Sequence, residues 1–230
     1  KRNAALAFGT SFATSPHTII ESGTLTGPVP QVRLAALLVL ADMPANQEAG
    51  VALVESMRLE HDRWLIDAFT SAAAAHAEYF LIALSSGPRV SDEFEPRLGI
   101  VAEHFARGRP NATQLGEVLR AVTSADANVA GAIVNGLAKG WQRDHPVKLS
   151  AEDDEVITKL LVALPADSKS KLVQLATVWG SGSIERYTED IAKALLETVS
   201  NDKKSATVRF AAAKQLVELR RNDANVTEKL

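Results

Sequence analysis

Cysteine is absent from all 230 residues. Its absence excludes, within these residues, a disulfide framework, a thiolate zinc site, a cysteine nucleophile and covalent attachment of haem. It leaves the compartment open, because a chain without cysteine suits a reducing cytosol and an oxidising periplasm equally.

The chain also lacks an excess of one charge and any long apolar run. It has 25 Lys and Arg residues against 28 Asp and Glu residues, a formal net charge of −3. No field exists to concentrate a polyanion, so we expect no nucleic-acid partner. No apolar run approaches the roughly 20 residues that span a bilayer, so we expect no membrane insertion by this segment.

Aromatic residues are scarce, at 5%, although 46% of the residues are hydrophobic. Ala, Leu and Val dominate, which favours closely packed helices over a β-sandwich. Apolar residues recur at helical spacing, and short breaks with Gly, Pro, Asn or Asp separate the segments. The fold class predicted is all-α, with helices at about 15–23, 32–40, 46–59, 62–75, 77–85, 93–107, 112–123, 126–141, 153–164, 168–179, 184–199 and 205–220.

The helices repeat at a regular spacing. Val32, Trp64, Pro96 and Val129 are separated by 32, 32 and 33 residues, a period typical of stacked helix pairs. The spacing then lengthens to 43 residues at Leu172 and 36 at Val208, which predicts an insertion loop between repeats at 142–151. No break is long enough for an interdomain linker, so residues 1–230 are interpreted as one domain. The chain is expected to be a piece of a longer protein.

The starts of several repeats share a pattern, in which a polar cap precedes a large apolar residue and a small residue follows three positions later. The pattern is clearest in Pro30-Gln-Val-Arg-Leu-Ala-Ala and Ala206-Thr-Val-Arg-Phe-Ala-Ala. A small residue one turn into a helix lets a neighbouring helix approach closely. We therefore expect Ala35, Ala130 and Ala212 to lie at close helix contacts.

At Val32-Arg33 and Val208-Arg209 the sequence resembles HEAT repeats, over about residues 30–220. The resemblance implies a right-handed α-α superhelix, a HEAT- or armadillo-like α-solenoid. Residues 32–44, 62–76 and 137–141 also resemble the HEAT-like middle region of large bacterial membrane-bound dehydrogenases. Members of that family join a sugar-dehydrogenase-like β-propeller, a HEAT-like region and a c-type haem domain. This second resemblance implies a periplasmic or otherwise extracytoplasmic parent protein, whose redox activity lies outside these residues.

The sequence predicts no catalytic, cofactor-binding or metal-binding residue, and the chain is not expected to be an enzyme. No Gly-x-Ser-x-Gly motif or suitably spaced carboxylate pair occurs. The acidic run Glu152-Asp-Asp-Glu155 is interpreted as a helix N-terminus, which acidic side chains stabilise. Trp64, Trp141 and Trp179 fall at helix ends, where an indole packs between repeats. The alternative is that one of them anchors a partner.

Three functions remain open. The leading hypothesis is a scaffold that binds proteins or flanking domains of its own parent, along a surface lined by the second helix of each pair. The alternative is an architectural spacer between catalytic and electron-transfer domains. A HEAT-like nucleic-acid-processing enzyme ranks last, because residues 151–230 hold 12 basic and 13 acidic side chains. The two ends carry apolar residues, Leu6, Phe8, Phe12, Val208, Leu216 and Leu219. They predict that the isolated chain either frays at residues 1–14 and 221–230 or self-associates weakly.

Overall fold

The computed structural model describes residues 15–57, 62–84, 90, 94–201 and 204–221. The chain divides into two compact units, Lys1–Gly180 (unit 1) and Ser181–Leu230 (unit 2). Every regular element in the described ranges is a helix, which confirms the all-α prediction. Leu6, Phe8 and Phe12 lie outside the described residues, as does the side chain of Leu219, and Val208 is 47% exposed. Self-association and the single domain over 1–230 stay predictions.

Each expected helix corresponds to one in the structure, with ends that differ by a few residues. Unit 1 contains α2 (Pro16–Glu21), α3 (Pro30–Ala41), α4 (Gln47–Ser56), α5 (Arg63–Ala75), α6 (Ala77–Leu84), α7 (Glu95–Arg107), α8 (Ala112–Val122), α9 (Ala127–Gly140), α10 (Ala151–Ala163) and α11 (Ala166–Val178). Unit 2 contains α12 (Gly182–Ser200) and α13 (Ala206–Arg221), which pack against each other.

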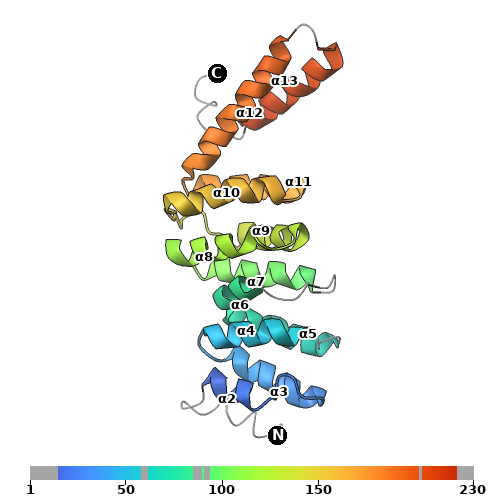
Figure 1. The fold of residues 1–230 in the computed structure, drawn as a ribbon, viewed down its shortest axis with the longest axis vertical. Helices are drawn as coiled ribbons and strands as arrows, with labels where there is room; N and C mark the ends of the chain where they lie inside the picture. Colours follow the sequence, from blue (N-terminus) through green and yellow to red (C-terminus); the bar gives the residue numbers. More distant parts are fainter. Residues whose placement is uncertain (1–14, 58–61, 85–89, 91–93, 202–203, 222–230) are drawn as a thin grey trace. The chain divides into compact units, whose positions relative to one another are not determined.

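The helices of unit 1 stack in two columns (Figure 1). Helices α3, α5, α7, α9 and α11 contact one another in succession and form the odd column. Helices α2, α4, α6, α8 and α10 form the even column in the same way. The repeat starts from Val32 to Leu172 all lie in the odd column. The period in the sequence is therefore the spacing between successive helices of one column.

The core runs between the columns and consists of aliphatic side chains with a few aromatic rings. Phe69 of α5 packs edge-on against Phe80 of α6 and Phe94, with ring centroids 5.8 and 5.3 Å away. Ala35 and Ala130 are buried in unit 1, and Ala212 is buried in unit 2. Burial of this kind is the main stabilising term for helices that are individually short.

The connection between α9 and α10, where the sequence predicts an insertion, packs against the turn between α7 and α8. His145 Nε2 lies 2.9 Å from the Pro110 carbonyl, and Trp141 Nε1 donates to the His145 carbonyl at 3.1 Å. Arg109, with φ of 56°, donates to Gln142 Oε1 at 3.1 Å. Polar contacts therefore hold this connection to the α7–α8 turn.

Helices α7 and α9 approach each other closely through glycine. A methyl group on Gly136 would collide with the Gly99 carbonyl and would lie 2.8 Å from the Ala102 side chain. A methyl group on Gly140 would collide with the Glu103 carbonyl and lie 3.0 Å from Ala106. The backbone of α9 thus rests directly on α7, which only residues without a Cβ permit.

We predict that Gly136→Ala lowers the free energy of unfolding by about 1–3 kcal/mol, because the added methyl group forces α7 and α9 apart. Urea titration followed by circular dichroism measures this. The matched control is Gly99→Ala, whose Cβ would meet its nearest atom, the Ala132 carbonyl oxygen, at an ordinary 3.4 Å. It should be neutral or stabilising by up to about 1 kcal/mol, since alanine favours a helix interior. Equal losses in both variants would contradict the close contact.

His76 is fully buried and joins three helix ends. It follows α5, its Nδ1 accepts the Asn46 N–H at the start of α4 at 3.0 Å, and its Nε2 lies 3.0 Å from the Leu40 carbonyl of α3. These partners require a neutral ring with the proton on Nε2. Burial lowers the pKa of His76 below the usual 6.5, and the Leu40 hydrogen bond opposes that effect.

The lowered pKa predicts loss of stability in acid. Below pH 6.5 the unfolded chain takes up a proton that the folded chain resists, so the contribution of His76 is present above that pH and is lost as pH falls through the folded pKa. We expect His76→Gln to be less stable than wild type at pH 8 but to lose less stability between pH 6.5 and 5. Urea titrations across this range provide the measurement, and parallel pH profiles would contradict the prediction.

Candidate interaction surfaces

The two columns of unit 1 carry opposite net charge. The five helices of the even column hold nine Asp or Glu residues and two Lys or Arg residues. The five helices of the odd column hold four Asp or Glu residues and seven Lys or Arg residues. We call the solvent-exposed side of the even column the acidic face. The basic face is the group on the odd column formed by Arg63, Trp64, Asp67, Arg97, Glu103, Arg107 and Lys139.

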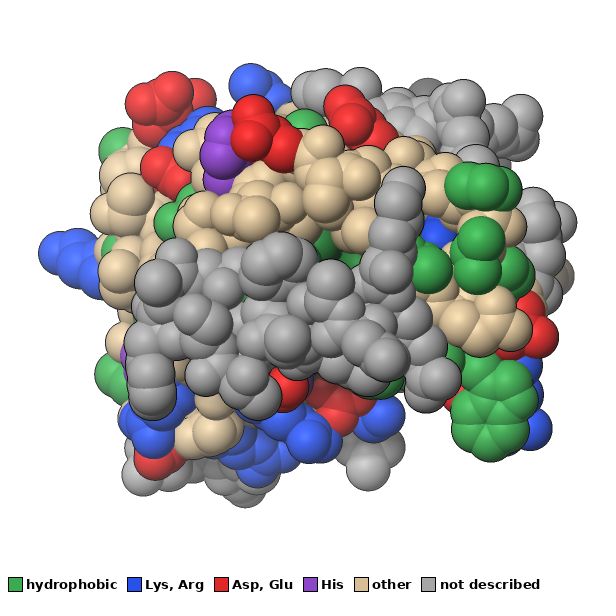
Figure 2. All heavy atoms as spheres, turned by 90° about the horizontal axis from the view of Figure 1, so that it is seen from below, with side chains coloured by type: hydrophobic (Ala, Val, Ile, Leu, Met, Phe, Trp, Pro, Cys, Tyr) green, Lys and Arg blue, Asp and Glu red, His purple; other side chains and the backbone are tan. Residues whose placement is uncertain are grey.

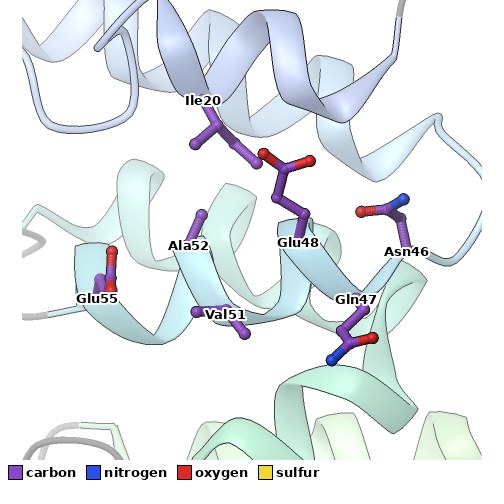
Figure 3. A pocket seen from close by; sticks show the side chains of 7 residues that line it. All are labelled: Ile20, Asn46, Gln47, Glu48, Val51, Ala52 and Glu55. Carbon is purple, nitrogen blue, oxygen red and sulfur yellow. The ribbon is translucent and has the colours of Figure 1, made fainter.

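A shallow groove lies between α2 and α4 on the acidic face (Figure 3). Ile20 of α2 and Ala52 of α4 face each other across it, and Val51, 42% exposed, adds apolar surface. Glu48 and Glu55 stand along α4 at the groove. An apolar floor flanked by carboxylates suits an aliphatic side chain that ends in a cation.

His17 links α2 to α4 at the rim of this groove. Its Nδ1 lies 2.6 Å from Glu48 Oε1, and its Nε2 lies 3.1 Å from Glu21 Oε1. The hydrogen bond to Glu48 and the charge of Glu21 raise the pKa of His17 above 6.5. Figure 2 looks onto this end of unit 1, where a histidine lies among acidic side chains along one edge. His17 therefore joins carboxylates of both helices at this rim.

The acidic run at the start of α10 has a second role that the sequence does not predict. Ser150 caps the helix by accepting the Asp153 N–H at 3.1 Å, in line with the N-terminal interpretation. Asp153 itself is buried, however, where it pairs with Arg120 of α8 and accepts the Ser150 hydroxyl at 2.7 Å. Its carboxylate also packs against Gly116. One residue of the run therefore joins two successive helices of the column.

On the basic face, two carboxylates are each shared by two cations. Asp67 of α5 lies 3.9 Å from Arg63 of the same helix and 3.3 Å from Arg97 of α7. The Arg63 side chain is 84% exposed and that of Asp67 is 44% exposed. The cluster has a net charge of +1, and its outermost group is a guanidinium.

The second cluster repeats this arrangement at the next helix contact. Glu103 of α7 pairs with Arg107 of the same helix and with Lys139 of α9, whose Nζ is 2.8 Å away. Glu103 is nearly buried, whereas the side chains of Arg107 and Lys139 are 64% and 72% exposed. The Lys139 hydrogen bond and the Arg107 charge lower the pKa of Glu103 below its usual 4.5, against the effect of burial. The second cluster thus holds a nearly buried carboxylate beneath two exposed cations. In the first cluster only Arg63 is more exposed than the carboxylate, because the Arg97 side chain is 33% exposed against 44% for Asp67.

The three tryptophans lie in two different environments. Trp141 and Trp179 are buried, in an edge-to-face pair with centroids 5.2 Å apart. Trp64 is 71% exposed at the start of α5. Its backbone N–H donates a hydrogen bond to Asp62 Oδ1 at 2.9 Å. The Arg63 guanidinium lies 6.0 Å from the centroid of its indole. Of the three predicted candidates, only Trp64 has a largely exposed side chain.

Comparison with protein families, curated proteins and solved structures found no match for this chain. Within the described ranges, no group of three or more His, Cys, Asp or Glu side chains is placed to hold a metal ion. No helix in those ranges has both the length and the apolar character needed to cross a bilayer. The geometry of the two faces is therefore the basis for a functional proposal.

The lowered pKa of Glu103 predicts a second loss of stability in acid, at lower pH than that of His76. The contribution of Glu103 is present above pH 4.5 and is lost as pH falls through the folded pKa. We expect Glu103→Gln to cost about 1 kcal/mol at pH 7, since both cations are largely exposed. Below pH 4.5 its unfolding curve should approach that of wild type. Glu117→Gln, at an exposed position of α8, is the control that should keep the wild-type profile.

Proposed function

We propose that unit 1 is a HEAT-like α-solenoid segment that acts as a protein-interaction scaffold. Its acidic face receives a segment of a partner that carries Lys or Arg beside apolar residues. The observation that carries this proposal is the charge of the even column, nine acidic against two basic residues, together with the apolar groove between α2 and α4. Charge of one sign steers a complementary partner, and the apolar floor adds contact area.

The helix order supports the choice of face. If each repeat begins in the odd column, at residues such as Val32 and Trp64, then α4, α6, α8 and α10 are the second helices of their pairs. In a solenoid these helices line a long shared surface on which an extended segment can lie. The partner segment can belong to a flanking domain of the parent protein or to a separate chain. An exported dehydrogenase parent, with a propeller and a haem domain, remains part of this proposal.

A selection from a random peptide library tests the proposal on the full chain. We predict that enriched peptides of about 12 residues pair Lys or Arg with a neighbouring apolar residue. Glu55→Lys should weaken their binding about fivefold or more, because it replaces the attractive charge beside the groove with a repulsive one. Fluorescence anisotropy of a labelled peptide gives the affinities.

Glu197→Lys on α12 is the matched control, since it changes the net charge equally at an exposed position of unit 2. It should alter the affinity less than about twofold. Val51→Ser should weaken binding through the groove floor without a change in charge. Enrichment of peptides without basic residues, or equal effects of Glu55→Lys and Glu197→Lys, would contradict a docking surface on the acidic face. A chain that enriches no peptide is better described as a spacer.

A further inference from the structure

The basic face contains two features that stability does not require. Arg63 occupies the first position of α5, where a helix disfavours a cation because its N-terminus already carries partial positive charge. Trp64 follows it and leaves 71% of its surface in solvent. Exposed aromatic and arginine side chains are the residue types that contribute most to protein interfaces. Their position side by side singles out this end of α5.

The ion pairs determine which charge a partner would meet. In the second cluster the carboxylate lies deeper than both cations that share it, because the Glu103 side chain is 11% exposed against 64% for Arg107 and 72% for Lys139. In the first cluster the Asp67 side chain is 44% exposed, between Arg63 at 84% and Arg97 at 33%. Each cluster keeps one uncompensated positive charge. The clusters occur at successive contacts, α5 with α7 and α7 with α9, so they lie along one column. A guanidinium or ammonium group that shares its carboxylate keeps N–H donors for a second acceptor.

We propose that the basic face is a second docking surface, which binds an acidic polypeptide segment with an apolar side chain against Trp64. Carboxylates of this segment pair with the cations of the two clusters, and the indole covers the apolar side chain. The argument for this occupant is charge complementarity. The proposal is independent of the function proposed for the acidic face, because it uses the other column. With both faces occupied, the chain holds two partners of opposite charge on one stack.

Direct binding to the full chain tests this surface. The probe is a synthetic peptide of about 12 residues, rich in Asp and Glu with one central Leu, and a peptide with Gln and Asn in place of the acids is its control. Trp64 reports binding through its fluorescence, because Trp141 and Trp179 are buried. We expect saturable binding of the acidic peptide, weakened by added salt, and none of the neutral peptide. Trp64→Phe should remove most of the signal.

The variants distinguish this surface from the charge of the chain as a whole. Arg63→Gln combined with Lys139→Gln should weaken binding about tenfold, and Trp64→Ala about fivefold, measured with a labelled peptide. Lys193→Gln, at an exposed position of α12, should change it less than twofold. Thermal melts establish that each variant is folded, and Glu55→Lys, on the other column, should leave this binding intact.

Three results would overturn the proposal. The first is affinity of the double variant equal to that of wild type. The second is tighter binding of an oligothymidylate of about 12 nucleotides than of the acidic peptide, since phosphates and bases also suit cations beside an indole. The third is concentration-dependent association of the wild-type chain in sedimentation that the double variant abolishes. That result would assign the surface to a second copy of this chain.

Discussion

The contact between α7 and α9 is the constraint on which the second cation cluster depends. The backbone of α9 lies on α7 because Gly136 and Gly140 have no side chain where the carbonyls of Gly99 and Glu103 approach. This approach brings Lys139 within 2.8 Å of Glu103 and so assembles the second cation cluster. A larger residue at either glycine would separate the helices and the ion pair together. Packing and surface charge are thus set by the same contact.

Because the chain alternates between the two columns, its net charge does not reveal the charge of either column. Successive helices enter opposite columns, so the even column collects acidic residues and the odd column basic ones while the whole chain has a net charge of −3. A helix-by-helix count in the sequence could have found this separation once the helix boundaries and their order were predicted. Net charge alone led to the expectation that no strong field exists.

The sequence predicts the helices well, because apolar periodicity and turn residues are local signals. Ala35 and Ala130 are buried, but the sequence misses the close contact at Gly136 and Gly140, near the other end of α9. It does not distinguish the exposed Trp64 from the buried Trp141 and Trp179, since all three lie at helix ends. The pairs that join neighbouring helices, such as Arg120 with Asp153, connect residues 33 apart in the chain, and no local pattern specifies such partners.

The central claim is that the two columns present separate surfaces. Hydrogen–deuterium exchange of the full chain tests it, with the acidic peptide and a library-selected basic peptide added in separate experiments. The account predicts that the acidic peptide slows exchange in α5, α7 and α9, and that the basic peptide slows it in α2 and α4. Each effect should leave the other column unchanged. Protection of the same helices by both peptides, or protection by neither, would contradict it.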